Sequence, residues 1–123
     1  MQLLFEASDE HEGETGLGLL GGSVTRLGAP RLPHIGWNVV RLVRDARLTA
    51  GLGPEAAFYH VHTFVCRPSD DSDVVGVAEY GEPFASIVER GAIFGAQFHP
   101  EKSSRDGLAL LRNFAGVCAG IPA

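Results

Sequence analysis

Lysine is almost absent from this chain, and its scarcity narrows the range of partners. Lys102 is the single lysine among 123 residues, and 15 acidic side chains against 10 basic ones give a formal net charge of −5. A protein that binds nucleic acid needs clustered Lys or Arg to offset the phosphates, and the basic residues here are scattered. The composition therefore argues against a nucleic-acid partner.

Cysteine and long hydrophobic runs are also scarce. Cys66 and Cys118 are the two cysteines, and they stand far apart without a CxxC pair. Buried thiols in a reducing cytosol fit this spacing better than a disulfide framework does. No apolar run approaches the roughly 20 residues of a membrane helix, and the N-terminal residues lack the basic segment of a signal peptide. We therefore expect a cytoplasmic protein without a membrane partner.

The chain is rich in short hydrophobic stretches that have the patterns of strands. Hydrophobic residues make up 45% of the chain and charged residues 20%, which is typical of one globular domain. The 16 glycines indicate many tight turns. Enrichment in β-branched and aromatic residues predicts strands over 23–27, 39–43, 57–66, 74–80, 84–89 and 92–98.

Two helices are expected, one at each end of the chain. Residues 1–7 are helix-compatible but have no N-cap, which is typical of the remainder of a longer helix. The better helix runs from Ser103 to Gly116 or a little beyond, with Ser103 as its N-cap. Its apolar residues repeat at helical spacing and form one face: Leu108, Leu111, Ala115 and Cys118.

Two segments have both a structural and a functional interpretation. Residues 16–21 match GxGxxG, but an acidic loop over 8–15 precedes them and a strand follows, which favours a turn over a dinucleotide site. Residues 33–38 form a predicted loop that holds the single tryptophan, Trp37. Such a tryptophan either plugs the end of the core or docks a partner through its large surface.

His99 and Glu101 are the main candidates for catalysis. They follow the predicted strand 92–98, and open α/β sheets bind ligands at the carboxyl ends of their strands. A histidine beside a carboxylate can be a base with its orienting partner, although no convincing nucleophile stands near it in the sequence. Two alternatives remain: a metal site made by His60, His62, His99 and Glu101, or histidines that hydrogen-bond within the core.

Several motifs together resemble one family. The stretch 97–103, QFHPEKS, is similar to the C-terminal signature of the class I glutamine amidotransferases. The glutaminase subunit of imidazole glycerol phosphate synthase is the member they resemble most, through MQLLFE at 1–6, PHIGWN at 33–38, FYHVHTF at 58–64 and EYG at 79–81. The resemblance implies an α/β fold with a flavodoxin-like open sheet that is incomplete at the N-terminus, with residues 1–123 as the C-terminal part of one amidotransferase domain.

The resemblance also implies a role for individual residues. His99 would be the base of a Cys-His-Glu triad and Glu101 would orient its ring, while Gln2, Thr63 and Phe64 would line the glutamine pocket. The residues expected at the surface that faces the cyclase subunit, in a heterodimer, are His34, Gly36, Trp37 and Asn38. The family releases ammonia from glutamine for the cyclase, which forms imidazole glycerol phosphate in histidine biosynthesis. No cofactor is implied.

The sequence departs from the family at the nucleophile. In the family, a stretch like 1–6 follows Gly-x-Cys-Leu-Gly, and neither this motif nor the glycine-rich oxyanion loop occurs in these residues. Phe64 stands where tyrosine is usual, and His60 where an apolar aromatic is usual. We therefore expect no glutamine hydrolysis by the chain as given, and marginal stability. The alternative function is a non-catalytic module that binds or regulates the cyclase.

Overall fold

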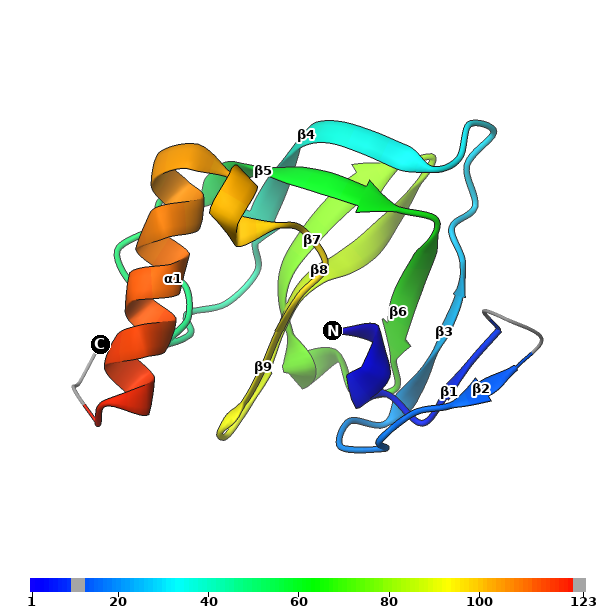
Figure 1. The fold of residues 1–123 in the computed structure, drawn as a ribbon, viewed down its shortest axis with the longest axis horizontal. Helices are drawn as coiled ribbons and strands as arrows, with labels where there is room; N and C mark the ends of the chain where they lie inside the picture. The colour runs from blue at the N-terminus through cyan, green and yellow to red at the C-terminus, as the bar shows by residue number, and fades with distance from the viewer. Residues whose placement is uncertain (10–12, 121–123) are drawn as a thin grey trace.

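The computed structural model describes residues 1–9 and 13–120 as one bent sheet with a single long helix beside it (Figure 1). Part of the acidic loop expected over 8–15, residues 10–12, therefore lies outside the described residues. The strands are β1 (Ala7–Ser8), β2 (Glu14–Thr15), β3 (Gly22–Arg26), β4 (His34–Leu42), β5 (Glu55–His62), β6 (Phe64–Pro68), β7 (Val74–Tyr80), β8 (Glu82–Arg90) and β9 (Ile93–Ala96). The helix is α1 (Ser104–Cys118), and the short 3-10 turns are η1 (Gln2–Leu4), η3 (Asp71–Asp73) and η4 (Pro100–Lys102).

The strands lie in the order β2-β1-β3-β6-β8-β7-β4-β5, and β9 pairs with β8. The pairings are antiparallel except for the parallel pair β1 and β3. Short connections favour this arrangement, since two antiparallel strands can be joined by a tight turn. Gly81, at φ 76°, is such a turn between β7 and β8. The predicted α/β class with an open sheet is confirmed.

Aromatic and branched side chains fill the space between the sheet and α1. Phe58 of β5 stacks on Phe98 at a ring-centroid distance of 4.0 Å, and both are almost fully buried. Leu110 is the large side chain that α1 contributes to this cluster. A second cluster around Phe5 and Leu20 packs the N-terminal residues against β3, β6 and β8. No helix in the described ranges is long and apolar enough to span a membrane.

The structure corrects three expectations from the sequence. Residues 1–7 form η1 and then β1 rather than a helix. The strand expected over 57–66 is broken at Thr63, whose carbonyl accepts from Leu27 N at 2.9 Å where the chain turns from β5 into β6. Residues 34–38 are not a loop, because they pair with β5 as the first half of β4. Residues 16–21 are irregular and lead into β3 rather than a helix, so the turn interpretation is confirmed.

Candidate functional site

His99 lies at the turn where the chain leaves β9 and enters η4. Its backbone N donates to Tyr59 O at 3.0 Å, which fixes this turn against β5. The buried Ser103 hydroxyl completes the attachment, because it donates to His99 O at 2.7 Å and accepts from Tyr59 N at 2.9 Å. Ser103 is the N-cap residue of α1, as predicted, but its side chain makes no capping hydrogen bond, so the capping role expected of the hydroxyl is wrong. The hydroxyl instead ties the histidine turn to the sheet.

The His99 and Glu101 side chains meet as the sequence predicted. Nδ1 of His99 lies 3.1 Å from Oε1 of Glu101, and the histidine side chain is 43% exposed. With its Nδ1–H donated to the carboxylate, the neutral ring presents the Nε2 lone pair away from that contact. The residues that the structure describes offer no hydrogen-bond partner for this Nε2. The pair is therefore arranged as a base with an orienting carboxylate.

The structure also joins two of the residues expected to line the glutamine pocket. Gln2 Nε2 donates to the carbonyl oxygen of Phe64 at 3.2 Å. Thr63 lies beside Phe64 at the corner between β5 and β6 and uses its carbonyl to hold Leu27. The three residues thus come together at one corner of the sheet, although their contact with a substrate stays a prediction.

His34, His60 and His62 form a buried cluster between β4 and β5. A carbonyl can only accept, so His62 Nδ1–H donates to Phe64 O at 3.0 Å and its Nε2 accepts from His34 Nδ1 at 2.8 Å. His60 Nδ1 likewise donates to Phe58 O at 3.0 Å, and its Nε2 accepts from Ser86 Oγ at 2.9 Å. Burial lowers the pKa of all three rings, that of His60 to about 4, so the cluster is neutral.

This cluster overturns two expectations. Because His60 and His62 use both ring nitrogens in hydrogen bonds, neither has a lone pair left for a metal, and the metal interpretation is wrong. Within 1–9 and 13–120, no three His, Cys, Asp or Glu side chains are placed to hold a metal ion. His34 is also buried, with its ring stacked on Tyr80 at 4.0 Å, so its expected place on the partner surface is wrong.

Side chains alternate between the two faces of β4, so the apolar residues that alternate with the buried face are exposed. Ile35, Trp37 and Val39 point outward and each is more than half exposed, while Gly36 and Asn38 lie between them. Val61 of β5 is paired with Ile35 and is also exposed, and the Tyr59 ring meets Trp37 edge-on at 6.1 Å. We call Ile35, Trp37, Val39 and Val61 the β4 face. Its Trp37 belongs to a surface patch rather than to a plug at the end of the core.

Neither cysteine is placed as a nucleophile for His99. Cys66 is buried in β6, and burial raises the pKa of its thiol to about 12. A thiol with so high a pKa is almost never a thiolate near neutral pH. Cys118 is exposed at the far end of α1 from the histidine turn. The described residues therefore supply a base and its partner without an activated thiol.

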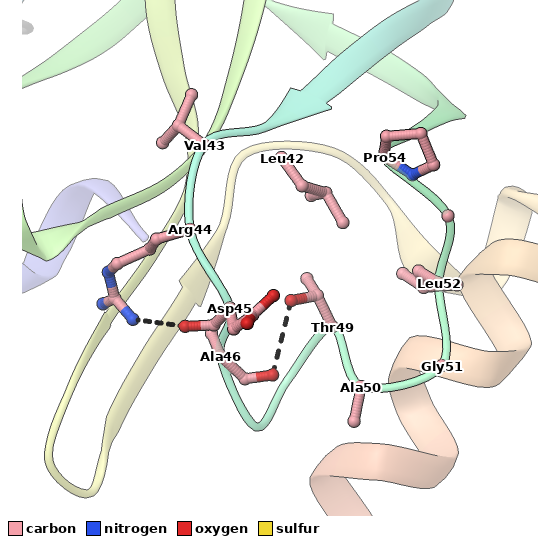
Figure 2. Close-up of a pocket in the computed structure, with 11 residues that line it drawn as sticks. Leu42, Val43, Arg44, Asp45, Ala46, Thr49, Ala50, Gly51, Leu52 and Pro54 are labelled. Carbon is pink, nitrogen blue, oxygen red and sulfur yellow. Dashed lines mark hydrogen bonds between the residues drawn. The ribbon is translucent and has the colours of Figure 1, made fainter.

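A cavity of about 660 Å³ lies elsewhere, in the connection 43–54 between β4 and β5 (Figure 2). Figure 2 shows Arg44 turned to the carbonyl of Asp45 at 3.1 Å and the Thr49 hydroxyl turned to Ala46 O at 3.4 Å. Arg44 also donates to Ser72 O and Glu89 O, so its guanidinium is used to hold backbone. None of the predicted site residues lines this cavity.

Comparison with known families identifies the family of the chain that holds the His99 turn. The family described as "Glutamine amidotransferase class-I" matches residues 1–117. The chain belongs to the class I glutamine amidotransferase family. The matched range includes His99 and Glu101, together with the stretch 97–103 that resembles the signature of this family.

Individual relatives narrow the similarity further. The chain is 47% identical over 115 residues to the imidazole glycerol phosphate synthase subunit HisH of Desulfitobacterium hafniense. These aligned residues cover 93% of this chain and 54% of that protein. It is 43% identical over 115 residues to HisH of Methanocaldococcus jannaschii, with coverage of 93% and 58%. The chain therefore spans little more than half the length of these curated relatives.

A solved structure supports the fold. A crystal structure from Thermoplasma acidophilum, provisionally described as part of a GMP synthase, superposes with a TM-score of 0.67 at 23% identity. The match covers 80% of this chain and 49% of that one. At this identity the likeness concerns the fold alone.

Sequence reasoning missed two elements of the site. These are the hydrogen bond between the Ser103 hydroxyl and Tyr59 N, and the one between His34 and His62. Both join residues that are far apart in the chain. A serine next to a helix start signals a cap, and nothing local distinguishes a cap from a bridge. The alternation of His34 with Ile35 and Trp37 was a usable signal for burial, because it has the period of a strand.

Proposed function

We propose that this chain carries the acid–base part of a glutaminase site of imidazole glycerol phosphate synthase, working in the cytoplasm. The observation that carries the proposal is the 3.1 Å contact between His99 Nδ1 and Glu101 Oε1, at the end of β9 in a class I amidotransferase chain. Relatives named as the HisH subunit, 43–47% identical, supply the choice of reaction. The reaction is the hydrolysis of glutamine to glutamate and ammonia.

His99 would act first as a base and then as an acid. Its Nε2 takes the proton of a thiol, and Glu101 stabilises the imidazolium that results. The thiolate sulfur attacks the side-chain amide carbon of glutamine, and the C–N bond then breaks as His99 returns the proton to the departing ammonia. A water molecule then gives a proton to His99 and attacks the carbon of the thioester that remains. The C–S bond breaks, His99 returns the proton to the sulfur, and glutamate leaves with the thiol restored.

Among the described residues, His99 can serve as the base, but no thiol lies within its reach. Cys66 is buried with a raised pKa, and Cys118 lies at the other end of α1. We therefore expect these 123 residues alone to release no ammonia from glutamine. Gln2, Thr63 and Phe64 would line the substrate pocket at the β5–β6 corner, and Phe64 offers an aromatic face without a hydroxyl group there.

A second candidate function is a non-catalytic module that binds the cyclase subunit. The β4 face favours it, because Trp37 is 55% exposed among apolar neighbours on a continuous strand pair. A large aromatic side chain at the centre of such a patch is typical of an interface residue that dominates affinity. Both functions use this face, in a heterodimer with the cyclase subunit, and they differ in whether glutamine is turned over.

One experiment tests the docking face and the expected lack of glutamine turnover by the isolated chain. The purified chain is titrated with the cyclase subunit, and ammonia release from glutamine is measured in the same mixtures. We expect binding without ammonia, and Trp37→Ala should weaken the affinity about tenfold or more because a buried aromatic contact is lost. Leu17→Ala is the matched control, since Leu17 is 60% exposed outside the β4 face and should leave affinity unchanged.

Each other result contradicts part of the proposal. Equal affinities for the parent and the Trp37→Ala chain would remove the β4 face as the docking surface. Ammonia release that survives His99→Ala would remove His99 as the base. Ammonia release that requires Cys66 would show that the buried thiol becomes accessible and replaces the expected nucleophile.

A further inference from the structure

The carbonyl oxygen of Phe64 accepts hydrogen bonds from two side chains that come from distant parts of the chain. Gln2 Nε2, in η1, donates to it at 3.2 Å, and His62 Nδ1, at the end of β5, donates at 3.0 Å. A carbonyl oxygen has two lone pairs and can accept both bonds. The N-terminal turn and the end of β5 thus meet at one backbone atom at the start of β6.

The sheet leaves this carbonyl free for side chains. Arg26 of β3 is paired with Phe64, and Leu27 N donates to Thr63 O at 2.9 Å. In an antiparallel ladder, a bond between these two neighbouring positions makes Arg26 and Phe64 a non-hydrogen-bonded pair. The Phe64 carbonyl therefore points away from β3, and side chains rather than a β3 partner set its direction.

His34 holds the ring of His62 in the tautomer that can donate to this carbonyl. The two residues are directly opposite in the register of β4 and β5, and His34 Nδ1 lies 2.8 Å from His62 Nε2. Since His62 Nε2 accepts from His34, the proton of His62 is on Nδ1, which faces Phe64 O. The His34 ring is itself stacked on Tyr80 at a ring-centroid distance of 4.0 Å, and the Tyr80 hydroxyl donates to Arg31 O at 2.9 Å. The two rings thus present one fixed N–H to Phe64.

The bond to Phe64 leaves most of the Gln2 amide group available. Its Nε2 has a second hydrogen, and its Oε1 has no hydrogen-bond partner among the residues that the structure describes. Gln2 also lines a cavity of about 240 Å³, together with Leu3, Glu14 and Thr15. An amide anchored at one end beside such a cavity can recognise a ligand that carries amide or ammonium donors, as glutamine does.

We propose that His62, held by His34, is a positioning residue that keeps the Gln2 amide in place for glutamine by fixing the Phe64 carbonyl. The assignment of glutamine as ligand rests on the proposed function, whereas the positioning rests on the three hydrogen bonds. Without this support, the Gln2 side chain would sample several rotamers, and ordering it again on binding costs conformational entropy. Loss of the His62 donor should therefore release Gln2 and weaken glutamine binding.

NMR spectroscopy of the 123-residue chain, labelled with ¹⁵N, tests the positioning without any need for turnover. In the parent chain, the side-chain amide of Gln2 should give one set of signals distinct from those of an unrestrained glutamine, and His62 should carry its proton on Nδ1. His62→Leu removes the donor, so the Gln2 signals should move to the unrestrained values. His62→Asn is nearly the same size as His62→Leu but places an amide N–H where Nδ1 was, so it should restore the parent's signals.

His60→Leu is the matched control. His60 is buried in the same cluster and the same strand, but it bonds to Phe58 O and Ser86 Oγ rather than to Phe64. Its loss should leave the Gln2 signals unchanged, with the parent's circular dichroism spectrum as the check on folding.

His34→Phe tests the same role without a change at His62, and it decides the matter if His62→Leu does not fold. The new ring can still stack on Tyr80, but the donor to His62 Nε2 is lost. The proton of His62 should then be shared between the two ring nitrogens, and the Gln2 signals should shift part of the way toward the unrestrained values.

Titration of the same samples with glutamine separates this inference from the proposed function. Glutamine should shift the Gln2 signals of the parent, and His62→Leu should weaken the binding about three- to tenfold, the effect of one lost hydrogen bond. Gln2 signals that are the same in the parent, His62→Leu and His34→Phe would overturn the positioning role, as would equal changes in His60→Leu and His62→Leu. Gln2 signals that depend on His62 but do not respond to glutamine would support the positioning and contradict the glutamine pocket of the proposed function.

Discussion

At the scale of single residues, the histidines divide by environment into two kinds. His99 is half-exposed with a carboxylate on Nδ1, which suits a group that exchanges protons. His34, His60 and His62 are buried with neutral rings whose hydrogen bonds hold β4, β5 and β8 together. Burial thus separates His99, the proposed base, from three structural histidines.

The buried histidines predict a loss of stability in acid. The pKa of His60 is about 4 in the fold against 6.5 for a free histidine, so below pH 6.5 the unfolded chain binds the proton more readily. The free energy of unfolding should be fully present above pH 6.5 and fall as pH drops toward 4. Because each pKa unit is worth about 1.4 kcal/mol, the loss from His60 amounts to at most roughly 3–4 kcal/mol. Urea unfolding over a series of pH values measures it.

His60→Phe is the matching variant for this prediction. It keeps an aromatic ring at the position but removes the titratable group. Its free energy of unfolding should fall less steeply between pH 6.5 and 4 than that of the parent, whatever its absolute stability. The remaining slope belongs to His34 and His62, whose pKa values burial also lowers. An unchanged slope in His60→Phe would contradict the assignment.

The sequence predicted the His99–Glu101 contact because the two residues are neighbours across one short turn. It predicted the same-face placement of His60 and His62 because alternate residues of a strand share a face. It could not predict that His34 bonds to His62, since that depends on the register between β4 and β5. Local chemistry is readable from the sequence, whereas contacts made by strand pairing are not.

At the scale of elements, the predictions that succeeded were those set by local pattern. The strand over 74–80 and the helix after Ser103 appear where the sequence placed them, within a few residues. The single strand predicted over 57–66 is wrong, because the chain breaks at Thr63, whose carbonyl accepts a hydrogen bond from Leu27 N, a residue far away in the sequence. The expected apolar face of α1 is exposed at Leu108 and Leu111, and the helix instead buries Gly107 and Leu110.

Ser103 links three elements, which gives a prediction at this scale. Its hydroxyl bridges Tyr59 N of β5 and His99 O before η4, at the start of α1. Ser103→Ala should lower the free energy of unfolding by about 1–3 kcal/mol, because the bridge is lost and Tyr59 N is left without an acceptor. Urea unfolding monitored by circular dichroism measures the difference.

Ser104→Ala is the control for this bridge. Ser104 is the exposed next residue, and it makes no side-chain hydrogen bond among the described contacts, so its loss should change stability by about 0.5 kcal/mol or less. Equal effects of the two substitutions would show that the Ser103 bridge does not stabilise the turn. The comparison thus isolates the bridge from the general effect of removing a serine at the start of α1.

At the scale of the whole molecule, two separate apolar surfaces face solvent. The β4 face carries Ile35, Trp37 and Val39, and the outer side of α1 carries Leu108 and Leu111. Apolar patches of this kind on an isolated chain mark interaction sites or promote association. The two faces lie on different elements, so one can be covered by a partner while the other stays open.

The exposed faces predict that the isolated chain is only marginally stable and gains stability from its partner. Alone, it should bind an apolar dye and unfold over a broad temperature range. A ligand at 100 times its dissociation constant adds about 2.7 kcal/mol, so saturation with cyclase should raise the melting temperature by roughly 10 °C for a chain of this size. Calorimetry at increasing cyclase concentration measures the shift, and Trp37→Ala should lose most of it. A monomer that binds no dye and melts sharply would contradict the marginal stability. A melting temperature that is the same with and without cyclase would contradict the role of the β4 face.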